Sequence, residues 1–259
     1  MLSLKNITAG GACKYYESAA GEYYDKDSKT TEWQGRIASE LGLAGQRVDF
    51  KDFENLAYGR GLAGEKLVKG AGSEKHLAGF DFTFSAPKSV SILAMNDSAI
   101  LEAHREAVTN TLKHLEENYI QTRVMKDGEK KIVDTGKIIV AKFEHHTNRN
   151  QEPQVHTHCA VMNVTMDLEG RYKTIHNKVF YHNQKEIGQL YRLELARVLI
   201  KNGYAIEITD QTQGFFKIKG VSDEMIKAFS TRTAEVNWHF WILWTKSIYQ
   251  RLFPVICNQ

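Results

Sequence analysis

The sequence predicts an α+β fold in which helices cover a mainly antiparallel central sheet. Helix-like and strand-like segments follow one another without the regular strand-helix-strand repeat of a parallel sheet. Asp127-Gly128 separates two strand-like runs at residues 122–134, which is a hairpin signal, and two longer strands are expected at residues 137–145 and 154–165. At 259 residues the chain is long enough for one sizeable core, so a single main domain is expected.

The N-terminal part begins with a strand-like run, LSLKNI, and continues as short helices broken by glycines, one of them within residues 49–59. In the next run, GFDFTFS, three phenylalanines alternate with polar residues such as Asp81 and Thr83. Because side chains alternate along a strand, this pattern predicts a half-buried strand with a polar face. Ser85 is then expected to cap a helix that has Pro87 in its first turn.

Two long helices are expected in the rest of the chain. Residues 98–120 carry apolar side chains at helical spacing, which predicts an amphipathic helix over one face of the sheet. A second helix at residues 183–203 precedes two short strands. Residues 234–259 differ, since they hold three of the four tryptophans, one acidic residue and no clear period; we interpret them as an atypical, truncated C-terminal tail.

Composition limits the classes of protein that fit. The net charge of +3 permits a nucleic-acid partner without requiring one. Three scattered cysteines without a C-x-x-C pair argue against a disulfide framework and against a cysteine zinc site. The chain shows no signal-peptide pattern and no apolar run near the roughly 20 residues that span a bilayer. A cytoplasmic protein without membrane insertion is therefore expected.

Six of the ten histidines lie between residues 145 and 182, and three of them have a useful spacing. His156 and His158 share one face of a strand. If His145 lies opposite His156 in an antiparallel hairpin, the three imidazoles converge on one point. Three neutral imidazoles can hold a divalent metal and leave coordination positions open for a substrate. The loop does not fix the register, so the alternative is an H-x-H that lines a polar strand face.

Five further residues are candidates for the chemistry. Asp81 can orient a ligating histidine, and its alternative is a solvated carboxylate at a sheet edge. Four phenols form two doublets eight residues apart: Tyr15, Tyr16, Tyr23 and Tyr24. Such aromatics often pack in a core. Beside a metal, however, a phenol can act as the nucleophile in phosphoryl transfer, so the histidines favour a catalytic interpretation of the doublets.

Four segments in this order resemble the relaxase domain of MobF-type conjugative relaxases, within the HUH endonuclease superfamily: YYESAAGEYY, FDFTFSAPKSVS, FEHHTNRNQEPQVHTH and FSTRT. The resemblance spans residues 1–233 and implies a palm-like two-layer sandwich. Thr157 stands in the middle of H-x-H, where the superfamily name implies a bulkier apolar residue. Family members usually continue into a segment that folds over DNA and then a helicase domain. Residues 234–259 replace both, so we expect intact ligands with impaired retention of single-stranded DNA.

The resemblance implies a metal-dependent endonuclease and transesterase. It would cut one DNA strand at a plasmid origin of transfer through a phosphotyrosyl intermediate and thereby initiate conjugation. Tyr15 would make the first cut and Tyr23 the second strand transfer, with supporting or substitute roles for Tyr16 and Tyr24. Asp81 would orient a histidine or help to deprotonate the nucleophile. The metal is expected to be Mg²⁺ or Mn²⁺, although Zn²⁺ or Ni²⁺ also suits the three ligands, which are His145, His156 and His158.

The expected partners are single-stranded DNA at the transfer origin with an adjacent duplex or hairpin, accessory proteins of the relaxosome, and the coupling protein of a type IV secretion system. Three alternatives remain from the sequence. One is a rolling-circle replication initiator, which shares the histidine motif and tyrosine chemistry. Another is a truncated relaxase remnant that binds DNA with impaired cleavage. The last is an unrelated tri-histidine metal hydrolase whose tyrosines are core residues.

Overall fold

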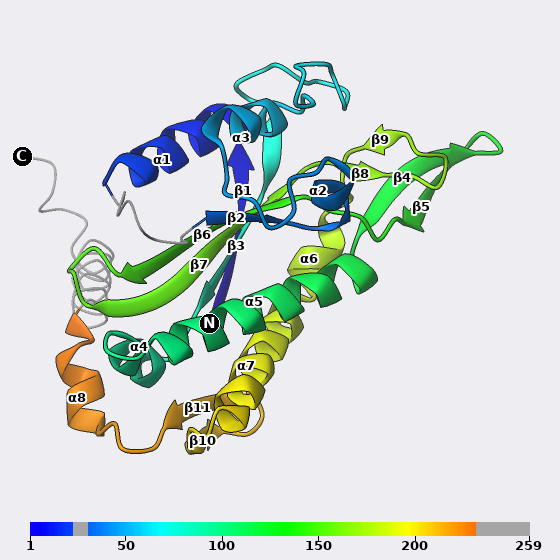
Figure 1. Ribbon diagram of the computed structural model, residues 1–259. Helices are drawn as coiled ribbons and strands as arrows, with labels where there is room; N and C mark the ends of the chain where they lie inside the picture. The colour runs from blue at the N-terminus through cyan, green and yellow to red at the C-terminus, as the bar shows by residue number, and fades with distance from the viewer. Residues whose placement is uncertain (23–30, 232–259) are drawn as a thin grey trace, which may run out of the picture.

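The structure is a computed structural model and describes residues 1–22 and 31–231 (Figure 1). Its centre is a five-stranded sheet in the order β1-β3-β7-β6-β2, and each neighbouring pair is antiparallel. The strands, in that order, are β1 (Leu2–Thr8), β3 (Leu77–Ser85), β7 (Pro153–Met162), β6 (Val140–Thr147) and β2 (Thr31–Gln34). The predicted α+β class and the antiparallel central sheet are confirmed.

Three helices cover one face of this sheet: α4 (Lys88–Ala94), α5 (Ser98–Asn118) and α7 (Gln184–Lys201). The long helices α5 and α7 lie next to each other, as Figure 1 shows. Phe80, Phe82 and Phe84 of β3 point into the core beneath them and are fully buried. Burial of each such ring contributes about 2 to 3 kcal/mol, so this layer supplies much of the folding free energy.

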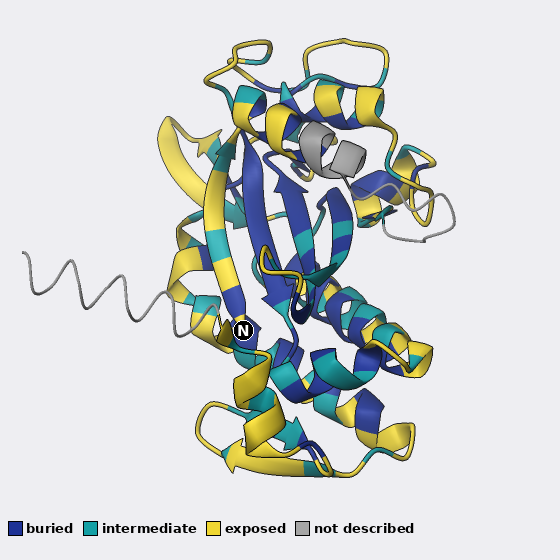
Figure 2. Cartoon of the chain, turned by 90° about the vertical axis from the view of Figure 1, so that its left-hand side faces the viewer, coloured by how far each residue is buried: buried dark blue, intermediate teal, exposed yellow. Residues whose placement is uncertain are grey.

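The other face is covered by α1 (Ala9–Glu22), α2 (Arg36–Glu40) and α3 (Phe50–Ala57), which share a second core with Trp33 of β2. Because both faces are covered, the polar face of β3 is buried too, with Asp81 6% and Thr83 9% exposed. The expectation of a half-buried strand is therefore wrong. Figure 2 shows the central strands buried along most of their length.

The start of α4 also differs from the expectation. Ser85 is the last residue of β3, lies opposite His156 of β7, and its amide donates to the carbonyl of Met1 at 2.8 Å. Pro87 occupies the N-cap position of a helix that begins at Lys88. Ser85 is thus not the N-cap, because the sheet holds its backbone three residues before the helix begins.

The remaining elements form small appendages. Three two-stranded sheets accompany the central one: β4 (Gln121–Lys126) with β5 (Glu129–Asp134), β8 (Thr165–Met166) with β9 (Tyr172–Lys173), and β10 (Ile206–Asp210) with β11 (Phe215–Ile218). The short helices are α6 (Lys178–His182) and α8 (Asp223–Ala228). In the predicted β4-β5 hairpin, Asp127 and Gly128 both have positive φ, at 56° and 79°, as a two-residue turn of type I′ requires.

Two sets of expectations fall outside the described residues: the second tyrosine doublet, Tyr23 and Tyr24, and the tail at 234–259. Within the described part, none of the helices combines the length and the apolar character needed to cross a membrane.

Candidate active site

The β6-β7 hairpin brings three histidines to one face of the sheet. His145 lies directly opposite His156, and His158 follows two residues along the same strand. The ring centroids are 5.2 Å apart for His145 and His156, 5.5 Å for His145 and His158, and 5.3 Å for His156 and His158. The three rings therefore form a nearly equilateral cluster. The pairing of His145 with His156 is the register that a metal position shared by the three histidines requires.

The spacing of these rings can be compared with that around a metal. An imidazole nitrogen binds a divalent ion at about 2.1 Å, so three ring centroids around one ion lie roughly 5 Å from one another. The observed 5.2 to 5.5 Å fits that arrangement. In the part of the chain that the structure describes, no group of three histidine, cysteine or acidic side chains is arranged so that it could hold a metal ion as it stands. The ring spacing, rather than a closed cage, is thus the feature that fits an ion.

His158 is oriented by two side chains of the neighbouring strand β3. Its Nδ1 lies 2.9 Å from Oδ2 and 3.2 Å from Oδ1 of Asp81. Thr83 Oγ1 lies 3.1 Å from the same nitrogen and donates to Asp81 Oδ1 at 3.3 Å. A carboxylate partner makes Nδ1 the donor, which leaves Nε2 with a lone pair for a ligand. Sequence reasoning missed Thr83, although its position two residues after Asp81 places it on the same face.

The other two histidines are suited to bind a cation in their neutral form. Nδ1 of His156 donates to the carbonyl of Gln154 at 2.8 Å, so its Nε2 is also left as an acceptor. Burial, with some repulsion from the neighbouring imidazoles, lowers the pKa of His145 to about 4, and burial likewise lowers the pKa of His156. Both rings are therefore neutral at pH 7, the state in which an imidazole can bind a metal.

The first tyrosine doublet divides between two environments. Tyr15 is 47% exposed, and its hydroxyl lies 3.3 Å from Nε2 of His158. Tyr16 is 2% exposed and its ring stacks on Phe143 at 4.2 Å. Burial raises the pKa of Tyr16 well above its ordinary value, and its hydroxyl has no hydrogen-bond partner among the described residues. Tyr15 thus lies in the histidine cluster, whereas Tyr16 is a core side chain in this arrangement.

Comparison with known proteins identifies relatives over most of the chain. The TrwC relaxase family model matches residues 9–244. The multifunctional conjugation protein TraI of Escherichia coli strain K12 is 38% identical over 249 residues, which is 92% of this chain but 14% of TraI. A metal-bound structure of the conjugative relaxase TrwC in complex with oriT DNA has a TM-score of 0.82 and 36% identity, covering 93% of this chain and 83% of that one.

A copper-bound structure of TrwC with oriT DNA has a TM-score of 0.81 and 34% identity, and it covers 100% of this chain and 86% of that one. The chain spans only a small part of the curated relatives it matches, 14% of their length. The match to the family model nevertheless extends over most of the sequence, from the strand-to-helix junction before Tyr15 past the last described residue. The chain therefore belongs to the TrwC relaxase family.

Proposed function

We propose that this protein cuts one strand of DNA at an origin of transfer and retains the cut end as a phosphotyrosine at Tyr15. The position of the Tyr15 hydroxyl, 3.3 Å from Nε2 of His158, is the observation that supports it most directly. This is the nitrogen left as an acceptor by Asp81 on the other side of the ring. The names of the relatives TrwC and TraI, a relaxase bound to oriT DNA and a conjugation protein, supply the substrate class.

In the proposed reaction the Tyr15 oxygen forms a bond to phosphorus, and the bond from phosphorus to the 3′ oxygen of the upstream nucleotide breaks. The phenol loses its proton, and the departing 3′ oxygen takes one up. The DNA 5′ end remains attached to the protein, and attack by a 3′ hydroxyl reverses the step. The exposure of Tyr15, 47%, leaves room for a DNA phosphate beside it.

His145, His156 and His158 would hold the divalent metal, and Asp81 would fix the ring of His158. When bound, the metal would neutralise charge on the phosphate and lower the pKa of a nearby phenol, which is otherwise about 10. Mg²⁺ or Mn²⁺ is our first choice. Zn²⁺ or Ni²⁺ also suits three imidazoles, and the TrwC structures include a copper-bound one.

The other phenols have different proposed roles. Tyr23 would serve a second strand transfer, with Tyr24 as its neighbour, and both lie outside the described residues. The burial of Tyr16 supports a packing role, in which its ring fixes the position of Tyr15 through an edge contact at 4.9 Å.

The proposed substrate is single-stranded DNA next to a duplex or hairpin. In support, one TrwC structure holds a 27-mer DNA that comprises the recognition hairpin and the cleavage site. Accessory proteins of a relaxosome and a type IV secretion coupling protein are the further partners that we propose, in the cytoplasm. The free thiol of the buried Cys159 is compatible with that compartment.

The test is formation of a covalent adduct. The protein is incubated with Mn²⁺ and labelled single-stranded oligonucleotides that span candidate transfer origins, and adducts are separated on a denaturing gel. We expect an adduct with wild type, none with Tyr15→Phe, and a large loss with His156→Ala. An adduct that survives Tyr15→Phe would assign the nucleophile to another phenol. Binding without any adduct from wild type would instead support a DNA-binding remnant.

A further inference from the structure

On the side opposite the three histidines, the β6-β7 hairpin is held by a chain of buried polar groups. Thr157 lies between His156 and His158, so its side chain points to the opposite face of the sheet, where it is 4% exposed. Its Oγ1 lies 2.8 Å from Nε2 of His104, and Nδ1 of His104 lies 2.8 Å from the hydroxyl of Tyr191. His104 belongs to α5 and Tyr191 to α7, and both side chains are fully buried.

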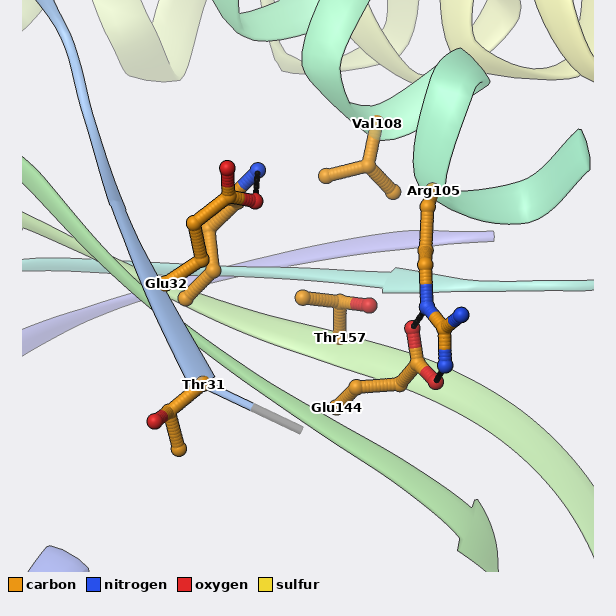
Figure 3. A pocket seen from close by; sticks show the side chains of 7 residues that line it. Thr31, Glu32, Arg105, Val108, Glu144 and Thr157 are labelled. Atoms are coloured by element: carbon orange, nitrogen blue, oxygen red, sulfur yellow. Dashed lines mark hydrogen bonds and ion pairs between the residues drawn. The ribbon is translucent and has the colours of Figure 1, made fainter. Parts of the chain in front are cut away.

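The next residue of α5 holds the other strand of the same hairpin. Arg105 donates from Nε and Nη2 to the two carboxylate oxygens of Glu144, at 2.8 and 2.7 Å. Glu144 precedes His145 on β6 and lies directly opposite Thr157. Figure 3 shows Glu144 and Thr157 facing the α5 residues Arg105 and Val108, which line a shallow pocket together.

These contacts have a defined geometry. A neutral imidazole has one donor and one acceptor, and both nitrogens of His104 are used, so the ring cannot rotate without breaking a bond. The paired bonds from Arg105 fix the direction of Glu144 as well as its distance. In the buried environment, a satisfied polar network of this kind specifies one arrangement, because every alternative leaves a polar atom without a partner.

We propose that His104 and Arg105 act as positioning residues: by holding the facing pair Thr157 and Glu144, they fix the spacing of the two strands that carry the three imidazoles. The inference rests on the proposed metal site. Thr157 shares its backbone with a ligating histidine on each side, so a displacement of Thr157 moves both. Ligating groups need to be held within about 0.5 Å of their productive positions, which is a small fraction of a strand spacing.

The first test removes the hydroxyl alone. Thr157→Val preserves the shape of the side chain, and Thr157→Ser preserves the hydroxyl. We expect Thr157→Val to weaken Mn²⁺ binding about 10-fold, as loss of a group that supports metal ligands does, and Thr157→Ser to bind within about threefold of wild type. The ligand-field spectrum of the Co²⁺-loaded protein should change in Thr157→Val and stay unchanged in Thr157→Ser.

A combined variant separates positioning from stability. Thr157→Val leaves His104 Nε2 buried without a partner. A triple variant, Thr157→Val with His104→Leu and Tyr191→Phe, removes all three hydrogen-bonding groups and should recover much of the lost thermal stability. If these contacts position the hairpin, the triple variant stays weak in Mn²⁺ binding despite that recovery. If they serve stability alone, binding returns with stability, and the inference is overturned.

The outcomes also separate this inference from the proposed function, because the titrations need no DNA. Wild-type binding with unchanged affinity and an unchanged Co²⁺ spectrum in all the variants would overturn the positioning role and leave the nicking proposal intact. An absence of metal binding by wild type would overturn both. Arg105→Lys cannot make the paired bonds to Glu144 and should lose Mn²⁺ affinity to a similar degree. Unchanged Mn²⁺ binding in Arg105→Lys would overturn the positioning role of Arg105.

Discussion

His145 and His156 face each other across the β6-β7 pair with their ring centroids 5.2 Å apart and their planes inclined by 26°. The cluster exists in this one register, because a slip of one residue would turn His156 and His158 to the opposite face of the sheet. Side chains that fix the register, or that orient the rings within it, should therefore control metal binding more strongly than their distance from the metal position suggests.

Asp81→Asn should weaken metal binding about 10- to 100-fold, because it removes the charge that orients His158 through the 2.9 Å contact at Nδ1. Isothermal titration with Mn²⁺ measures the change. Thr83→Val is the matched control, since it removes a neutral hydroxyl from the same cluster and should cost less. Equal affinities for wild type and Asp81→Asn would contradict the orienting role.

Tyr16→Phe should leave the yield of covalent adduct unchanged, whereas Tyr15→Phe should abolish it. The Tyr16 hydroxyl is buried without a hydrogen-bond partner among the described residues, so its removal also relieves a desolvation cost. The free energy of unfolding should stay the same or rise by up to about 1 kcal/mol, which urea denaturation measures. Loss of the adduct in Tyr16→Phe would show that this phenol takes part in the reaction.

Protein stability should fall as the pH is lowered from about 6.5 to 4, in part because of His104. Burial lowers the pKa of His104 to about 4, whereas in the unfolded chain it is near 6.5. Between these values the unfolded state binds the extra proton, so the stabilising contribution is complete above pH 6.5 and is lost toward pH 4. The loss amounts to about 3 kcal/mol.

Urea denaturation at several pH values checks this prediction through the slope of the unfolding free energy against pH. His104→Gln keeps one hydrogen-bonding side chain at the site but cannot titrate, so its stability should fall less steeply over the same range. The comparison with wild type isolates His104 from other groups, such as His145, which has a similarly lowered pKa. Equal slopes in the two proteins would contradict the assignment.

Gly79→Ala should destabilise the sheet by about 2 to 3 kcal/mol. A Cβ at this position of β3 would lie 2.1 Å from the carbonyl oxygen of Val161 and 3.0 Å from Cα of Met162, and these are backbone atoms of β7. Thermal unfolding measures the effect. Gly10→Ala is the control, because its Cβ would meet nothing closer than 3.5 Å. Since Gly10 lies in helix α1, stability should stay the same or rise by up to about 1 kcal/mol.

The sequence predicted those parts of the site that depend on short-range periodicity. The period of two placed His156 and His158 on one face. The position of His145 opposite His156 was a supposition about the register, which the sequence leaves open and the structure shows. The same alternation identified Phe80, Phe82 and Phe84 as core. Helix α5 was predicted because its apolar residues recur at helical spacing over many turns, and α7 was expected at residues 183–203.

The parts of the fold and the site that could not be predicted depend on contacts between residues far apart in the chain. Asp81 was predicted to orient a histidine, but the pattern of one strand could not show which histidine, because His158 lies 77 residues away, or that Thr83 is buried beside it. His104 gave no signal, since its partner Thr157 is 53 residues away. Strand β2, Thr31–Gln34, is too short for a periodic pattern, and the difference between Tyr15 and Tyr16 follows from packing on Phe143.

The β6-β7 hairpin is not a surface ribbon, since β7 has β3 on one side and β6 on the other. Amide protons in such a strand exchange with solvent mainly when the whole domain unfolds. The backbone that carries His156 and His158 therefore keeps its shape regardless of which ion is present. A chelator should strip the ion reversibly, and reloading should need no refolding, so one preparation can be carried through a series of metals and compared directly.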